Sequence, residues 1–207
     1  MNAKLILGMT VALSMATALP VQAGSESTDL DAKTTAIIKR DFRDKGIAKA
    51  DRVNQDELQA ACSKYMDDVP VDTKVKLEDE QVKTIKWPAD GKFMGDWKAG
   101  EKLAQSGKGM TWSDKADEPA GGNCYNCHQL SSKEIAYGTI GPSLLNYAKK
   151  HGSRERAERR AYGHMYNAKA YAACANMPRF GSMSILTEAQ IKDLVALLLD
   201  PESPVNK

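Results

Sequence analysis

The chain has 207 residues, and its 29 Lys and Arg residues against 27 Asp and Glu residues give a formal net charge of +2. That length suits one domain, or one domain with a sizeable extension. A charge so close to neutral argues against nucleic-acid binding, which usually needs a strongly basic surface. Aromatic residues make up only 6% of the chain, so the core must depend on aliphatic packing or on an added apolar group.

The first residues have the pattern of a secretory signal. Lys4 supplies a short basic start, residues 5–19 carry no charge, and small residues precede a cut after Ala23. The apolar stretch is shorter than the roughly 20 residues that a helix needs to cross a bilayer. An uncleaved membrane anchor is the alternative interpretation of this segment. No later stretch has the length and apolar character of a span. The sequence therefore predicts a signal peptide over 1–23 and an exported, periplasmic chain with no membrane span after cleavage.

Residues 24–90 are charged and helix-prone, and we expect them to form a helical N-terminal extension. Its clearest helix begins at Asn54 as N-cap, with Glu57 three residues later, and its apolar positions are Leu58, Ala61, Cys62 and Tyr65. Between residues 66 and 95 the prolines and glycines predict loops and short extended pieces.

Residues 91–207 are predicted to form a second domain. Asp96 can cap a helix that stops near Gly107, and residues 153–172 favour another helix. A last helix begins at Thr187, with Gln190 completing a capping box and with Ile191, Leu194, Val195 and Leu198 on one face. There is no hairpin signal, so the predicted fold class is mainly α.

The segment Cys124-Tyr125-Asn126-Cys127-His128 carries the chemistry. Two thiols three residues apart can each add to a haem vinyl group, and the adjacent histidine then becomes an axial ligand of the iron. We expect a short helix over 125–132 to present His128. A zinc knuckle would need a second ligand pair, and a redox-active cysteine pair would need thioredoxin-like strands and helices. The motif therefore predicts one covalent haem c, held by Cys124, Cys127 and His128.

The second axial ligand decides what such a haem does. The downstream candidates are Met165, Met177, Met183, His151 and His164. Met177 is favoured because it lies in a loop sequence before the last helix, where Pro178 would stiffen the chain. Met183 is its main rival, and a core role for Met177 is the other interpretation. Methionine ligation closes the second face of the iron and raises its reduction potential, which favours electron transfer.

Cys62 and Cys174 are the two cysteines that the haem motif leaves over. Export permits disulfides, so we expect these two to be bonded, with two separate thiols as the alternative. Because Cys174 is three residues before Met177, the bond would tether the extension to the ligand loop.

A basic cluster is formed by Arg154, Arg156, Arg159 and Arg160, with Glu155 and Glu158 between them. Glu155 and Arg159 are spaced as a helical i, i+4 pair. A solvated helix face is the simpler interpretation, and a docking surface for an acidic redox partner is the other.

The domain 91–207 resembles a class I cytochrome c, and the chain more narrowly resembles the SoxX family. The blocks that carry the second resemblance are residues 95–104, 121–128, 138–144, 166–168 and 176–181, together with residues 46–62. The resemblance implies a class I cytochrome c fold with His128 and Met177 as axial ligands. It also implies that the carbonyl of Pro142 accepts a hydrogen bond from His128, as in small class I cytochromes, although a turn proline is the simpler interpretation.

SoxX proteins are the small cytochrome subunits of SoxAX thiosulfate-oxidising complexes. The resemblance implies a heterodimer with a catalytic SoxA-type subunit, which joins thiosulfate to a cysteine of a SoxYZ-type carrier. This chain would be a non-catalytic subunit that accepts electrons and passes them to a small periplasmic cytochrome. A free-standing cytochrome shuttle and a haem sensor or small-molecule-activating haem protein are the alternatives.

Overall fold

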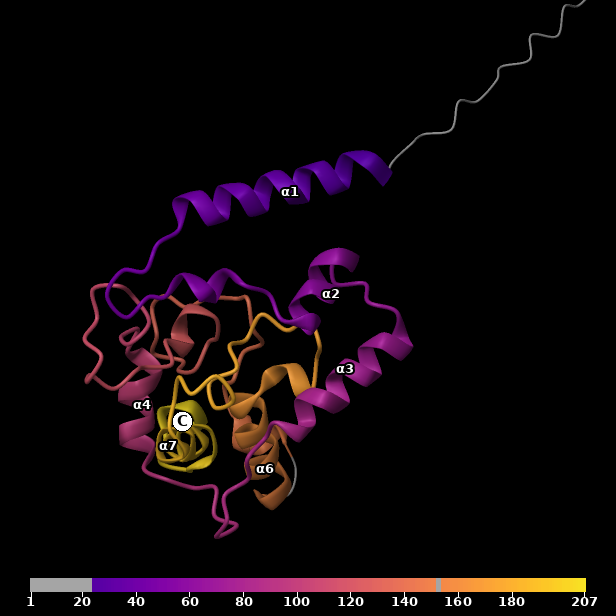
Figure 1. Cartoon of the computed structure of the whole chain (residues 1–207). Helices are drawn as coiled ribbons and strands as arrows, with labels where there is room; N and C mark the ends of the chain where they lie inside the picture. The colour runs from indigo at the N-terminus through magenta and orange to yellow at the C-terminus, as the bar shows by residue number, and fades with distance from the viewer. Residues whose placement is uncertain (1–23, 152–153) are drawn as a thin grey trace, which may run out of the picture. The chain divides into compact units, whose positions relative to one another are not determined.

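The computed structural model describes residues 24–151 and 154–207 (Figure 1). The predicted signal peptide, residues 1–23, lies outside this part of the chain. The elements are α1 (Gly24–Asp41), η1 (Ala50–Val53), α2 (Glu57–Tyr65), α3 (Val71–Lys83), α4 (Trp97–Gln105), η2 (Cys124–Asn126), α5 (Tyr147–Lys150), α6 (Arg154–Tyr166), η3 (Ala168–Ala170), α7 (Glu188–Leu199) and η4 (Pro204–Asn206). The described residues contain one isolated bridge, between Lys45 and Ala48, and no strand. The predicted mainly α class is confirmed.

The chain divides into two compact units, with the division after Phe42. The first unit contains α1, whose Leu30 and Ile37 side chains are exposed. The second unit runs from Arg43 to Lys207 and contains the haem motif. The segment 43–90, which the sequence analysis assigned to the extension, thus folds as part of the same unit as the motif.

Helices α4 and α7 pack against each other and form the base of this unit (Figure 1). Gly100 allows the approach, because a Cβ atom at this position would overlap the backbone of Asp193 in α7. The backbone N–H of Asp96 donates to the Asp193 carboxylate, with an N–O distance of 2.8 Å. The start of α4 is therefore tied to the middle of α7.

The last helix carries the apolar face that the sequence predicts. Thr187 and Gln190 form the predicted capping box, and α7 ends at Leu199, before Pro201. The predicted core positions Ile191, Leu194, Val195 and Leu198 are all buried. They join a large hydrophobic cluster that also takes in α6 and the aromatic side chains of Phe93, Tyr125, Tyr147, Tyr162, Tyr166 and Phe180.

A second, smaller cluster lies under α2 and α3. It consists of Leu58, Cys62, Val69, Leu77 and Ala173, with Ala61, Tyr65 and Cys174 packed against it. The apolar face predicted for α2 is thus correct. This cluster joins the segment before the haem domain to the chain just ahead of Met177.

Two predictions about the segment 54–95 were wrong. Helix α2 is capped by Asp56 and Gln59 rather than by Asn54 and Glu57, because the Asp56 carboxylate accepts the Gln59 N–H at 2.8 Å. Helix α3 occupies part of the region predicted as loop. Leu77 is its only fully buried residue, and its valines at 71, 75 and 82 are exposed, although most of its residues are good helix formers.

Two helix ranges in the haem domain also differ from the prediction. The motif forms only the short 3₁₀ turn η2, and the predicted helix over 125–132 is absent. Helix α6 ends at Tyr166 instead of near residue 172, because the Asn167 side chain accepts from the Lys169 N–H and starts the turn η3. Among the described helices, none has the length and apolar character needed to cross a bilayer.

Candidate functional site

The haem motif places three functional side chains on one tight turn. Asn123 adopts a left-handed backbone conformation with φ of 47° and starts η2. The His128 N–H then donates to the Cys124 carbonyl at 2.9 Å. One turn of backbone therefore fixes where Cys124, Cys127 and His128 lie relative to one another.

The segment 138–144 holds this turn from outside. Gly138, Gly141 and Leu144 donate their backbone N–H groups to the carbonyls of Tyr125, Cys127 and Gln129, each at 2.8 Å. These carbonyls are the groups that a continuing helix would have used internally. The pairing with 138–144 thus explains why the predicted helix over 125–132 does not form.

His128 has one ring nitrogen engaged and the other available. Its Nδ1 lies 2.8 Å from the Pro142 carbonyl oxygen, as the family resemblance implies. A carbonyl only accepts, so Nδ1 carries the proton and Nε2 keeps its lone pair for a metal. Gly141 fits closely against the ring, because a Cβ atom there would overlap the imidazole. The contact with Pro142 thus leaves Nε2 as the ring nitrogen that could bind a metal.

The two motif cysteines are free thiols in this structure. Burial raises the pKa of the Cys124 thiol to about 12. A redox-active pair needs a lowered pKa, so this environment argues against thiol–disulfide chemistry at the motif. Within the described residues, the one grouping with metal-ligand geometry is Cys62, Asp67 and Cys174. It excludes the motif thiols, and two of its members form a disulfide, so the zinc knuckle gains no support.

Met177 borders an open cavity of about 680 Å³. Met183, Ile185 and Ala120 also line this cavity, whereas Cys124, Cys127 and His128 do not. Met177 and Cys124 pack against the same hydrophobic cluster.

The other ligand candidates are placed differently. Met165 is only 8% exposed and lies in the core, whereas Met183 is 58% exposed. The Nδ1 atom of His164 lies 3.0 Å from the Arg160 carbonyl oxygen, and its ring stacks on Tyr171. His151 packs its ring on Tyr147. Burial lowers the pKa of both histidines. Of the five candidates, Met177 is the one that is partly buried and borders the cavity.

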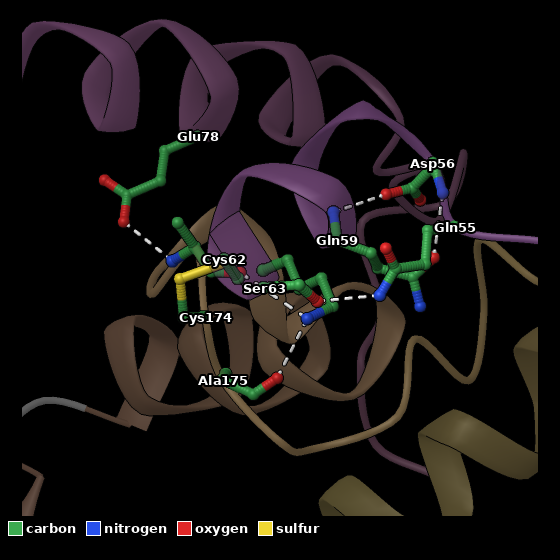
Figure 2. The surroundings of a disulfide bond; sticks show 10 residues. Gln55, Asp56, Gln59, Cys62, Ser63, Glu78, Cys174 and Ala175 are labelled. Atoms are coloured by element: carbon green, nitrogen blue, oxygen red, sulfur yellow. Dashed lines mark hydrogen bonds between the residues drawn. A yellow bond between two sulfur atoms is a disulfide. The ribbon is translucent and has the colours of Figure 1, made fainter. Parts of the chain in front are cut away.

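Cys62 and Cys174 are joined in a disulfide, with their Cα atoms 5.6 Å apart (Figure 2). The bond links α2 to the chain three residues before Met177. Two further contacts hold the chain around Met177, and neither could be predicted from the local sequence. Arg179 forms an ion pair with Asp56 at 2.6 Å, and the Ala173 N–H donates to the Glu78 carboxylate at 2.8 Å. The segment 43–90 therefore packs directly on the predicted ligand loop.

The arginine cluster on α6 is mostly a solvated face. Arg154 pairs with Glu158 at 2.8 Å, so the ion pair differs from the predicted Glu155–Arg159 pair. The Arg159 guanidinium instead lies 3.9 Å from the centre of the Trp87 ring. This cation–π contact draws Arg159 toward the aromatic core and away from a continuous basic patch.

Comparison with known proteins places this geometry in a family. The cytochrome c family model matches residues 98–200, which include the motif, Pro142 and Met177. Residues 98–200 of this chain thus form a cytochrome c domain. The cytochrome is also 40% identical over 155 residues to an uncharacterized lipoprotein from Aquifex aeolicus (strain VF5), covering 74% of this chain and 73% of that protein.

The family implies a covalently bound haem c and a function in electron transfer. The residues of this cytochrome fit that group: two free thiols and a histidine with Nε2 available stand on one turn, and Met177 packs against the same hydrophobic cluster as Cys124. When bound, the haem supplies reversible one-electron chemistry. Cys124 and Cys127 would attach it, His128 would bind the iron with its ring oriented by the Pro142 carbonyl, and Met177 would supply a second ligand.

Proposed function

We propose that this cytochrome carries one haem c, ligated by His128 and Met177, and acts as the electron-accepting subunit of a SoxAX-type complex. In this proposal the partner is a SoxA-type subunit, whose active site joins thiosulfate to a cysteine of a SoxYZ-type carrier. That joining releases two electrons and one proton. The subunit would take the electrons one at a time and pass each to a small periplasmic cytochrome.

The observation that carries the electron-transfer part is the available ring nitrogen of His128 together with the packing of Met177. His128 has its Nε2 free for a metal, and Met177 packs against the same cluster as Cys124. With both faces closed, the iron has no open position for substrate, so the site suits electron transfer better than small-molecule activation.

Two features support a partner subunit over a free-standing shuttle. The blocks that resemble SoxX begin at residue 46, well before the start of the family match at residue 98. The chain also contains the separate helical unit with α1, whose Leu30, Ile37 and Phe42 side chains are exposed. A shuttle that only collides with its partners has little use for such additions.

The proposed location is the periplasm. Haem c is attached outside the cytoplasm, and the similar Aquifex protein is described as a lipoprotein, which also points to an extracytoplasmic site. The predicted signal peptide agrees with this location.

The proposal is tested by expressing the chain with its neighbouring genes and purifying it by size-exclusion chromatography. We expect it to elute with a second haem-containing chain. When thiosulfate and the carrier are added, we expect the absorption bands of reduced haem to appear in both chains. A monomer that carries a methionine-ligated haem but elutes alone would replace the complex with the free-standing shuttle. A haem that binds carbon monoxide as readily as an open site would favour the sensor.

A further inference from the structure

Helix α2 contacts the Met177 loop on both sides of the methionine. Cys62 forms the disulfide with Cys174, three residues before Met177 (Figure 2). Asp56, the N-cap of the same helix, accepts from Arg179, two residues after Met177, at 2.6 Å. One short helix therefore anchors both ends of the stretch 174–179.

The Asp56 anchor is held in place by its own helix. One carboxylate oxygen accepts the Gln59 backbone N–H at 2.8 Å, and the other oxygen binds Arg179. The Gln59 side chain in turn accepts the Asp56 N–H at 3.1 Å. The Arg179 side chain is only 11% exposed, so breaking this pair would leave a largely buried cation without its partner.

The chain between the two anchors has little freedom of its own. The Ala175 carbonyl accepts from the Lys169 ammonium at 3.0 Å, and α3 adds the contact from Glu78 to the Ala173 N–H (Figure 2). Pro178, directly after the methionine, has a fixed φ angle. The movement that would carry Met177 away from a bound iron therefore requires one of the two anchors to open.

We propose that α2 is a splint for the axial methionine, with Asp56, Cys62, Cys174 and Arg179 as its positioning residues. The inference rests on the proposed ligation by Met177 and deepens it. A thioether is a neutral ligand, so the time it spends on the iron depends on how rarely its loop opens locally. Loss of an anchor raises the population of the open loop and exposes the iron to external ligands.

The test measures imidazole binding to the ferric, haem-loaded full-length protein by stopped-flow absorbance. We expect Asp56→Asn, and separately the double variant Cys62→Ala and Cys174→Ala, to bind imidazole about tenfold faster than the wild type. The methionine-to-iron charge-transfer band should weaken in the same variants. Arg179→Lys keeps the cation but loses the planar donor group, so its rate should fall between those of the wild type and Asp56→Asn.

The matched control is Glu158→Gln, which removes the ion pair with Arg154 on α6 and leaves the loop anchors intact. Its imidazole rate should stay at the wild-type value. Unchanged imidazole rates in Asp56→Asn would overturn the splint, as would a wild-type spectrum without the methionine band. Asp56→Asn keeps the disulfide, so it tests the splint even if the double cysteine variant does not fold. A wild type with the band but with no partner chain would refute the complex and leave the splint standing.

Discussion

A single carbonyl decides which nitrogen of His128 is available. Because the Pro142 oxygen lies 2.8 Å from Nδ1, the imidazole is fixed as the tautomer with a free Nε2. Such a contact also makes the ring a better electron donor to a metal. The spacing of the motif predicts the ligand from sequence, but the closeness of Gly141 to the ring becomes visible only in the fold.

The role of Met177 can be tested at the same scale. Met177→Ala removes the only thioether among the candidates that is both partly buried and next to the cavity. We expect the methionine-to-iron charge-transfer band to disappear and the reduction potential to fall, because methionine ligation raises the potential. Absorption spectra and redox titration measure both. Met183→Ala, from the same cavity, is the control and should keep the band. If Met183→Ala loses the band and Met177→Ala keeps it, the ligand assignment is reversed.

The crossing of α4 and α7 shows how one residue without a side chain sets the position of two elements. Gly100 lies against the Asp193 backbone, and the Asp193 carboxylate accepts the Asp96 N–H. The loop that follows α4 returns to it, with the Gly122 N–H donating to the Leu103 carbonyl at 2.9 Å. The haem motif begins two residues later, so this crossing also positions the motif.

The prediction at this scale concerns Gly100→Ala. Alanine is the better helix former by about 1 kcal/mol, but its Cβ would overlap backbone atoms of α7 that cannot rotate away. We expect the overlap to dominate and the free energy of unfolding to fall by about 1–3 kcal/mol. Urea unfolding measures it. Lys102→Ala, at an exposed position of the same helix, should leave stability nearly unchanged, and equal stability of the two variants would refute the close crossing.

Elements with both a cap and an apolar face could be predicted from the sequence. Helices α4 and α7 have the expected N-cap residues, Asp96 and Thr187, because the capping signal and the buried face agree. Helix α3 has no side-chain cap, and its only fully buried residue is Leu77. The ion pair between Asp56 and Arg179 also had no sequence signal, since its partners meet only when the chain is folded. The disulfide that braces the Met177 loop was thus predictable from the sequence, whereas the ion pair that braces its other end was not.

At the scale of the whole molecule, the two clusters of the unit 43–207 are joined across the ligand loop. The larger cluster includes Phe180 and has Met177 packed against it, and the smaller includes Ala173 with Cys174 packed against it. In addition, the Asn167 amide donates to the Thr84 hydroxyl at 2.8 Å, which links the end of α6 to the end of α3. The segment 43–90 is therefore part of the folded haem unit and should not be removable without loosening it.

A fall in pH should weaken the ion pair between Asp56 and Arg179, which holds the segment 43–90 to the Met177 loop. Burial alone would raise the pKa of Asp56, but the hydrogen bond from Gln59 and the Arg179 guanidinium outweigh it, so the pKa is lowered overall. A lowered pKa in the folded state means that Asp56 stabilises the protein above its ordinary pKa of about 3.9 and loses this effect as pH falls further. We expect Asp56→Asn to be less stable than the wild type at pH 7 and nearly equal to it near pH 2. Urea unfolding at the two pH values measures this.

The control for the acid experiment is Asp79→Asn, which changes an exposed carboxyl group on α3. Its stability difference from the wild type should be small at both pH values. A difference for Asp56→Asn that stays the same at pH 7 and pH 2 would show that its effect comes from lost packing and not from the charge.

The disulfide joins the first cysteine of the chain to the last and encloses both haem cysteines between them. In the proposed export the thiols would emerge in the order 62, 124, 127 and 174, so an oxidant acting on the growing chain would meet neighbouring thiols first. Pairing of Cys62 with Cys124 would consume one thiol of the motif, and its correction by exchange is slow. Early conversion of Cys124 and Cys127 to thioethers removes that competition. The connectivity thus favours an order of maturation in which the haem thiols react before Cys174 closes the loop.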